Sequence, residues 1–257
     1  MLDSQPVASL PLSGWLPEAS VIRGESSIAE NLARVRDSIA QAALRAGRQA
    51  DEITLIGISK TQPAEAIAAA VRAGLGHVGE NRVQEAADKL PTARQLLIGE
   101  ATPVFHMVGH LQTNKAGSAV GLFDRIDSLD SLKLAQALSR HLNGARDLPV
   151  LIEVYVGDDL HRPGLRPDQA IDVVGGILEV PGLRVEGLMT VAPLGGDARA
   201  AFVKVRELKE TLSETFPRVH FGVLSMGMSD DYLVAIEEGS TEVRIGTALF
   251  GPRMMRF

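Results

Sequence analysis

The chain has 257 residues, of which 45% are hydrophobic and 23% are charged, a composition typical of a soluble globular protein with a sizeable core. Its formal net charge is −6 and no block of Lys and Arg residues stands out, which argues against a nucleic-acid-binding protein because such proteins carry a basic face. The absence of cysteine excludes disulfides and thiolate metal sites and fits a reducing cytosol.

The N-terminal segment indicates a cytoplasmic protein without a membrane anchor. It lacks both the basic segment and the continuous apolar segment of a signal peptide. No run in the chain reaches the roughly 18 apolar residues that a membrane-spanning helix needs. Pro6, Pro11 and Pro17 predict an irregular arm over residues 1–26, followed by one folded domain over residues 27–257.

Ordered structure is predicted to begin at Ser27. Ser27 and Glu30 have the spacing of a capping box, in which the two side chains satisfy the first backbone N–H groups of a helix. Apolar residues then recur at helical intervals from Ile28 to Ile39, so residues 27–46 are predicted to form an amphipathic helix.

Beyond this helix, apolar β-rich runs alternate with helical patterns. The predicted strands lie at 53–58, 76–79, 104–108, 123–127, 149–156, 183–191, 220–225 and 242–246. The predicted helices lie near 63–73, 81–90, 113–120, 130–142, 167–179, 196–215 and 229–238. Regular alternation implies parallel strands joined by crossover helices, and eight strands in a chain of this length favour a (β/α)8 barrel. A doubly wound open sheet is the main alternative.

The segment GLGHVG at residues 74–79 matches the dinucleotide-binding pattern GxGxxG. In a true fingerprint the glycines follow a strand and open a helix, which places the helix N-terminus at the pyrophosphate. Here the glycines follow a predicted helix and lead into a strand, an order typical of a helix C-terminus and turn. No nicotinamide site is predicted.

Two loops near the C-terminus predict a phosphate site. In a barrel, phosphate groups are commonly bound by the loops after strands seven and eight. Ser225 and Gly227 follow the seventh predicted strand, and Gly246 and Thr247 follow the eighth, so that hydroxyl and backbone N–H donors meet at one rim. Simple turn chemistry explains each loop equally well when it is considered alone. Residues 229–231 are predicted to begin a helix.

Two cations lie on predicted strands. Arg244 interrupts the eighth strand and faces either the surrounding helices or the barrel interior, where it needs a partner. Lys60 ends the first strand, in the segment GISKTQP. A partly desolvated lysine can form a Schiff base with a carbonyl compound, although a single lysine at a strand end is more often simply solvated.

His106 and His110 flank the end of the third predicted strand. Their spacing spans strand and loop, with no HExxH pattern and no nearby carboxylate, so no metal site is predicted.

Seven segments of the chain carry a further signal. They are LIGISKTQPAEAI, AGLGHVGENRVQEAADK, FHMVGHLQTNK, IDSLDSLKLAQAL, VLIEVYV, VEGLMTVAP and LSMGMSDDYLVAIEEGSTEVRIGTALFG. In this order they closely resemble the pyridoxal-phosphate (PLP) homeostasis proteins, the YggS/PROSC-type family of PLP-binding proteins, from about residue 27 to 251. The resemblance implies a single (β/α)8 barrel similar to the N-terminal domain of alanine racemase.

The resemblance also implies a cofactor site without catalytic residues or metal ligands. PLP would be held as an internal aldimine on Lys60. The other implied contacts are Ser225, Gly227, Gly246 and Thr247 for the phosphate, Arg244 for the pyridine nitrogen, and Asn81 and Met189 for the pocket wall. His110, Asn114 and Lys115 match a family segment but receive no role.

The departures from the family are few. Phe105 stands where the family usually has tryptophan. VYVGDDLHRPGL at 154–165 replaces the usual NVSxExxKxGL, so that Tyr155 takes the asparagine position and Arg162 the lysine position. These changes affect a rim loop rather than cofactor binding.

The predicted function is a non-catalytic PLP carrier and regulator in vitamin B6 and amino-acid homeostasis. Its expected partners are PLP and apo PLP-dependent enzymes as recipients, and it is expected to be a monomer or weak dimer. The alternative is a PLP-dependent amino-acid racemase. An arginine at the ring nitrogen restrains carbanion chemistry, because it opposes protonation of that nitrogen, although alanine racemases work with arginine there.

The expected absence of a second acid/base group also disfavours the racemase. Alanine racemase takes a tyrosine from an extra β domain of another subunit, whereas this chain ends at Phe257, just past the barrel. Its only tyrosines, Tyr155 and Tyr232, match no such motif. A Schiff-base enzyme of the class I aldolase type without PLP is a third alternative, which the neutral phosphate site disfavours.

Overall fold

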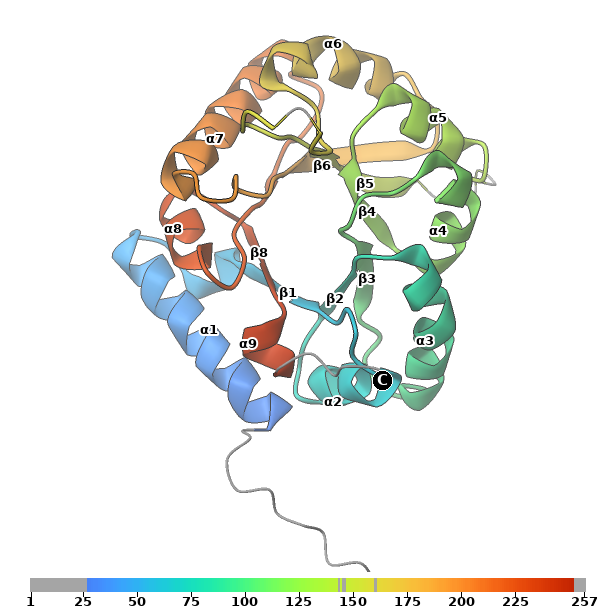
Figure 1. Ribbon diagram of the computed structural model, residues 1–257, viewed down its shortest axis with the longest axis vertical. Helices are drawn as coiled ribbons and strands as arrows, with labels where there is room; N and C mark the ends of the chain where they lie inside the picture. The colour runs from blue at the N-terminus through green and yellow to red at the C-terminus, as the bar shows by residue number, and fades with distance from the viewer. Residues whose placement is uncertain (1–26, 143, 145–146, 160, 252–257) are drawn as a thin grey trace, which may run out of the picture.

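The computed structural model describes residues 27–142, 144, 147–159 and 161–251, so the predicted arm over residues 1–26 lies outside the described residues. A ring of strands lies at its centre, surrounded by helices (Figure 1). The strands are β1 (Thr54–Ile58), β2 (His77–Glu80), β3 (Val104–Met107), β4 (Arg125–Leu129), β5 (Leu148–Glu153), β6 (Leu183–Met189), β7 (Val223–Ser225) and β8 (Glu242–Ile245). The helices are α1 (Ile28–Arg45), α2 (Ala64–Arg72), α3 (Val83–Leu96), α4 (Ala116–Leu122), α5 (Leu132–Ser139), α6 (Pro167–Leu178), α7 (Ala198–Thr215), α8 (Tyr232–Glu237) and α9 (Thr247–Phe250), with 3-10 turns η1 (Ala50–Glu52) and η2 (Thr113–Lys115).

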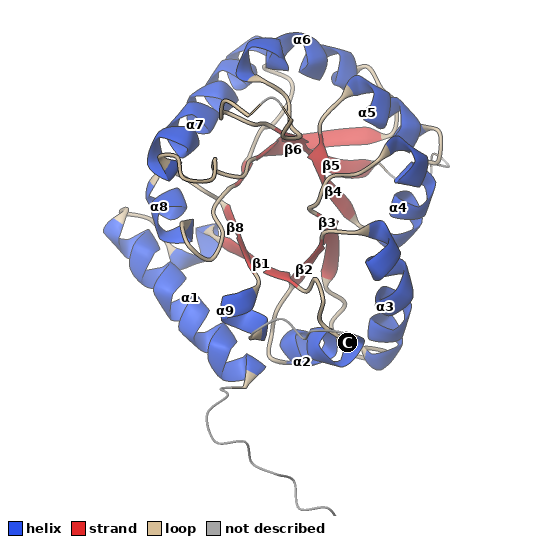
Figure 2. Ribbon diagram, in the orientation of Figure 1, coloured by secondary structure: helices blue, strands red, loops and turns tan. Residues whose placement is uncertain are grey.

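The sheet is a closed barrel in strand order, as Figure 2 shows. Each strand pairs in parallel with its neighbour in sequence, and β1 pairs with β8 to close the ring. The (β/α)8 prediction is therefore confirmed over the open-sheet alternative, which would leave two unpaired edges. Because all strands run in the same direction, their C-terminal ends meet at one rim.

The ring of helices begins with α1, which precedes the first strand. The predicted capping box is present: Ser27 Oγ accepts the N–H of Glu30, and the Glu30 side chain accepts the N–H of Ser27. The apolar face of α1 is buried against α8 and α9. Asn31 Nδ2 donates to the carbonyl oxygen of Leu249 over 3.0 Å, so the first helix is bound to the last one.

The N-terminal half of the barrel interior is charged. Arg125, the first residue of β4, reaches Glu242, the first residue of β8, across the ring, with Nη1 2.8 Å from Oε1. Its Nε also donates to Asp127 over 2.7 Å. Burial opposes ionisation of Asp127, but Arg125 and then His106 outweigh it and hold its pKa below the usual range. These ion pairs lie toward the N-terminal ends of the strands, away from the C-terminal rim.

Some boundaries differ from the predictions. The helix predicted at 229–238 begins only at Tyr232, and Asp231, not Ser229, is its N-cap residue. The reason is a turn in which the Asp231 side chain accepts the N–H of Met228 over 2.6 Å. α9, directly after Gly246, was not predicted.

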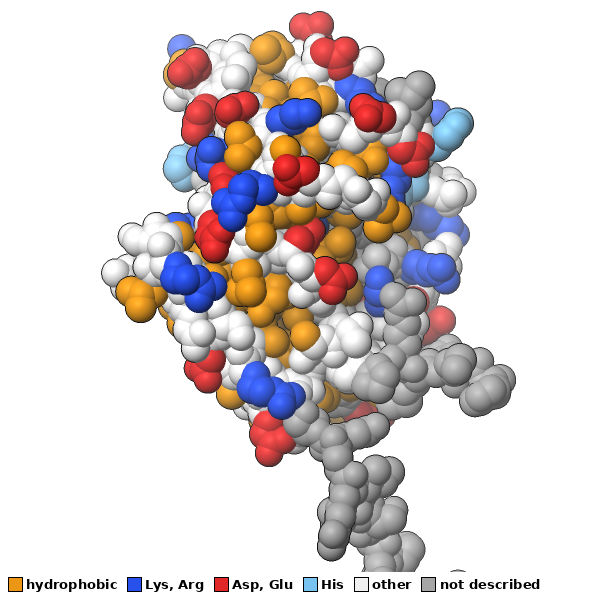
Figure 3. Space-filling model, turned by 60° about the vertical axis from the view of Figure 1, so that its left-hand side comes forward, with side chains coloured by type: hydrophobic (Ala, Val, Ile, Leu, Met, Phe, Trp, Pro, Cys, Tyr) orange, Lys and Arg blue, Asp and Glu red, His pale blue; other side chains and the backbone are white. Residues whose placement is uncertain are grey.

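The outer surface carries charges of both signs. On the side where α1, α7 and α8 lie, acidic and basic side chains are interspersed with apolar ones (Figure 3). Within the described part of the chain, none of the helices is both long enough and apolar enough to cross a membrane.

Gly187 lies where β6 and β7 approach each other closely. A Cβ atom there would lie 1.9 Å from the carbonyl oxygen of Val223 in β7. We expect Gly187→Ala to lower the free energy of unfolding by about 2 kcal/mol or more, because the two strands must separate. Urea unfolding followed by circular dichroism measures this. Gly121→Ala near the end of α4 is the matched control, since its Cβ meets no atom within 4 Å; an equal loss in both variants would contradict the steric explanation.

Candidate functional site

A cavity of about 430 Å³ opens at the C-terminal rim of the barrel. It is lined by Ile58, Lys60, Gln62, Asn81, Val108, Val191, Met228, Ser229, Asp230, Arg244, Gly246, Thr247, Phe250 and Gly251. Five of the eight predicted site residues are therefore brought together here: Lys60, Asn81, Arg244, Gly246 and Thr247. Their roles remain predictions.

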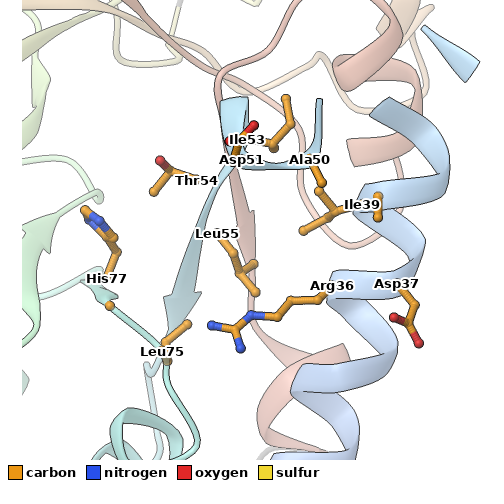
Figure 4. Close-up of a pocket in the computed structure, with 12 residues that line it drawn as sticks. Arg36, Asp37, Ile39, Ala50, Asp51, Ile53, Thr54, Leu55, Leu75 and His77 are labelled. Carbon is orange, nitrogen blue, oxygen red and sulfur yellow. The ribbon is translucent and has the colours of Figure 1, made fainter. Parts of the chain in front are cut away.

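A second hollow, of about 480 Å³, lies at the opposite end of the strands, between α1 and β1 (Figure 4). Arg36 extends into it from α1, and its guanidinium donates to the carbonyl oxygen of Gly74 over 2.7 Å. Thr54 and His77, the first residues of β1 and β2, lie at this end. The hollow is therefore separated from Lys60 by the length of the strands.

Lys60 lies in a tight turn directly after β1. The Gln62 N–H donates to the Ser59 carbonyl oxygen over 3.0 Å, and Thr61 between them has φ +64°, a left-handed conformation that is unusual for a β-branched residue. The side chain of Lys60 is half-buried, and within the described part of the chain its amine has no hydrogen-bond or ion-pair partner. A lysine amine without a partner at the wall of a cavity is available to react with a carbonyl compound.

The two predicted phosphate loops lie side by side. Gly227 has φ +95°, and a Cβ atom there would lie 2.6 Å from that of Ala235, so the position requires glycine. Its carbonyl oxygen accepts the N–H of Arg244 over 3.0 Å, which ties the loop after β7 to β8. Gly246 and Thr247 line the cavity at the start of α9, and the first N–H groups of a helix have no acceptor within the helix.

Gly227 does not line the cavity itself, and neither do Ser225 and Met189. Both are buried, and they are paired neighbours on β7 and β6. Ser225 contacts Arg244, whose Nη1 donates to its hydroxyl oxygen over 2.9 Å.

Arg244 faces the barrel interior and is 4% exposed. Its Nη1 also donates to the carbonyl oxygen of Ser225 over 2.7 Å, and its Nη2 to that of Thr190 over 2.6 Å. The partners that a buried arginine needs are thus carbonyl and hydroxyl oxygens rather than a carboxylate. Burial lowers the pKa of Arg244. The guanidinium is held rigidly at the base of the cavity.

Glu153, the last residue of β5, is a buried acid that the sequence analysis missed. It is 8% exposed, and its Oε2 has no hydrogen-bond partner among the described residues. Burial, with a contribution from Asp130, raises its pKa to about 7, against the opposing charges of Arg244 and Arg162. The only signal in the sequence is an acid within the apolar run VLIEVYV.

His106 and His110 do not converge. His106 lies in the barrel interior, with Nδ1 3.3 Å from a carboxylate oxygen of Asp127. His110 is exposed at the rim, 3.2 Å from Asp130. In residues 27–251, apart from the few positions left undescribed, no group of three or more His, Cys, Asp or Glu side chains could hold a metal ion.

The rim loop after β5 accommodates Tyr155 in a specific way. The tyrosine is buried, and the Arg166 guanidinium lies over its ring at 4.9 Å. A Cβ atom on Gly157 would lie 2.4 Å from the Tyr155 hydroxyl oxygen, so the glycine makes room for the phenol. Tyr155, which is larger than the asparagine usual at this position, is therefore packed within the loop.

Comparisons with known proteins agree with this architecture. The family model of the alanine racemase N-terminal domain matches residues 26–254. The pyridoxal phosphate homeostasis protein of Escherichia coli strain K12 is 39% identical over 232 residues, which cover 89% of this chain and 97% of that protein.

Solved structures give the same picture. PipY of Synechococcus elongatus PCC7942, in a structure with PLP bound, is similar with a TM-score of 0.75 at 35% identity, covering 88% of this chain and 100% of that chain. An alanine racemase of Clostridium difficile 630 matches with a TM-score of 0.63 at 14% identity, covering 87% of this chain and 58% of that chain. The second likeness shows the shared fold alone.

Glu153 predicts a pH dependence of stability. Its pKa of about 7 exceeds the ordinary 4.5, so between these values the folded state binds a proton that the unfolded state releases, and stability falls as pH rises. The whole pKa difference corresponds to a change of roughly 3 kcal/mol in the free energy of unfolding. We compare the free energy of unfolding of Glu153→Gln with that of the original protein. We expect this difference to favour the variant more at pH 8 than at pH 5.

Urea unfolding at the two pH values measures this effect. Glu210→Gln, at an exposed position of α7, controls for the loss of one carboxyl group. A stability difference for Glu153→Gln that is the same at both pH values would contradict the raised pKa.

Proposed function

The chain belongs to the pyridoxal phosphate homeostasis protein family, within the wider alanine racemase N-terminal domain family, and on this basis we propose that it binds PLP at the rim cavity. In this proposal the protein holds and hands on PLP in vitamin B6 and amino-acid homeostasis and catalyses no reaction of its own. Apo PLP-dependent enzymes are the proposed recipients.

The observation that carries the proposal is the Lys60 amine, which has no partner among the described residues and lies in the wall of a cavity that Gly246 and Thr247 also line. PLP supplies an aldehyde and a phosphate on one aromatic ring. The Lys60 amine condenses with the aldehyde, forming a C=N bond with loss of one water, while Gly246 and Thr247 offer hydrogen-bond donors to the phosphate. The cavity of about 430 Å³ lies in the range usual for small ligands.

Arg244 supports binding without carbanion chemistry. Its guanidinium is fixed by Ser225 and Thr190 and is proposed to face the pyridine nitrogen. A fixed guanidinium disfavours protonation of that nitrogen and so weakens the ring as an electron sink. Asn81 is proposed to contact the cofactor as part of the pocket wall. Met189 and Gly227 are proposed to pack behind the residues that line the pocket.

The positions of the tyrosines support a carrier rather than a racemase. Racemisation needs a second acid/base group on the opposite face of the cofactor. Tyr155 is buried in the rim loop and Tyr232 begins α8, and neither of them lines the cavity.

Lys60→Ala tests the attachment site. We expect the purified protein to be yellow and borohydride to fix PLP to the peptide that contains Lys60, because reduction of the C=N bond makes the link permanent. Lys60→Ala is expected to lose this adduct completely, as detected by peptide mass spectrometry. Lys133→Ala, at an exposed position of α5, is the matched control and should retain it. Labelling of a different lysine would refute the assignment.

Incubation with L-amino acids separates the carrier from the racemase. We expect the PLP-loaded protein to give no more D-isomer than free PLP does, because neither Tyr155 nor Tyr232 lines the cavity and the fixed guanidinium of Arg244 weakens the ring as an electron sink. Chiral chromatography over a panel that includes L-alanine measures the products. Robust turnover of any of these amino acids would overturn the non-catalytic proposal.

A further inference from the structure

The side chain of Lys89 ends behind the turn that carries Lys60. Lys89 lies on α3, outside the barrel, and its side chain is 10% exposed. Its ammonium group lies 2.6 Å from the carbonyl oxygen of Ser59 and 3.2 Å from that of Gln62. These carbonyls precede and follow Lys60, so one cation binds both sides of the turn.

Two carboxylates hold this ammonium group in place. Glu85, one turn earlier on α3, is 2.8 Å from it, and Glu80, the last residue of β2, is 2.9 Å from it. Each carboxylate also binds the turn directly: Glu85 accepts the N–H of Thr61, and Glu80 accepts the hydroxyl of Ser59. Lys89, Glu80 and Glu85 are called the Lys89 cluster below.

The Lys89 cluster makes hydrogen bonds to the residues around Lys60 but not to Lys60 itself. Ser59, Thr61 and Gln62 each make a hydrogen bond to the cluster, whereas among the described residues Lys60 makes none. The bond from Thr61 to Glu85 also fixes the left-handed backbone at φ +64°. The cluster binds Ser59, Thr61 and Gln62 on the outer side of the turn. The side chain of Lys60 lines the cavity instead.

The amines of Lys89 and Lys60 therefore have opposite environments. Lys89 donates hydrogen bonds to three oxygen acceptors, forms an ion pair with Glu80 and is nearly buried, so its nitrogen is committed to these contacts. Burial raises the pKa of Glu80, and Lys89 and Ser59 oppose that rise. Among the described residues, none of the three side chains of the cluster makes a hydrogen bond or an ion pair with the Lys60 amine.

We propose that Lys89 is a positioning residue for cofactor attachment, which acts through Glu80 and Glu85 to fix the 59–62 turn so that the Lys60 amine faces the phosphate donors at Gly246 and Thr247. This inference rests on the proposed function of the cavity. A purely structural contact between α3 and the turn would affect stability and all ligands alike.

Lys89→Met tests the proposal, since it keeps the length of the side chain and removes the ammonium group. One readout is the Kd of pyridoxine 5′-phosphate, which has the ring and phosphate of PLP but no aldehyde. The other is the rate at which PLP becomes attached to Lys60, trapped with borohydride and located by peptide mass spectrometry. Lys133→Met is the matched control.

We expect the Kd of the analogue to stay within about twofold, because Gly246 and Thr247 lie after β8, in a different part of the chain from the Lys89 cluster. The attachment rate should fall about tenfold or more, since a displacement of roughly 1 Å in a reacting group can cost about 10²-fold. Unchanged attachment, or an equal loss in both readouts, would overturn the role of Lys89.

Two further outcomes are distinguishable. If Lys89→Met does not fold, Glu85→Gln removes one carboxylate at a half-buried position, and the same separation of the two readouts is expected with a smaller effect; its absence would also overturn the inference. If the original protein itself attaches no PLP at Lys60, the proposed function fails, and the inference fails with it.

Discussion

The ion pair between Arg125 and Glu242 sets the internal order of the barrel. It joins the first residues of two opposite strands, and Arg125 also pairs with Asp127. Buried ion pairs of this kind are costly to form and costly to break, because an unpaired partner would remain in the interior. Arg125, Asp127 and Glu242 are all buried, so their charged groups face one another rather than solvent. The polarity of the parallel strands then concentrates every available reactive group at the other rim.

At that rim, rigidity and reactivity are divided among different residues. Arg244 is held by the backbone oxygens of Ser225 and Thr190, and the turn around Lys60 is held by the Lys89 cluster. Among the residues that the structure describes, none pairs with the amine of Lys60. A site built in this way is pre-organised, because little conformational freedom remains to be lost when a ligand binds.

The alternation of apolar runs and helical patterns was sufficient to predict the barrel, and strand-end positions were sufficient to bring Lys60 together with Arg244, Gly246 and Thr247. The helix start at Ser229 was wrong, since a side-chain turn at Asp231 replaced the expected cap. Glu153 and Lys89 were missed for a related reason. Their environments depend on which neighbours the closed fold places around them, and no local pattern encodes that. Lys89 has the spacing of an ordinary helical ion pair with Glu85, whereas its contacts to Ser59 and Gln62 exist only in three dimensions.

The bond between Asn31 and Leu249 has a consequence for the way the protein forms. It joins the first described helix to the last, and the cavity likewise combines Lys60 with Thr247. Contacts between such distant parts of the chain carry a high loop-closure entropy and form late in folding. A partly synthesised chain therefore has no cavity with which to capture a ligand. A ligand can stabilise the finished barrel by mass action, but it cannot act as a template for folding.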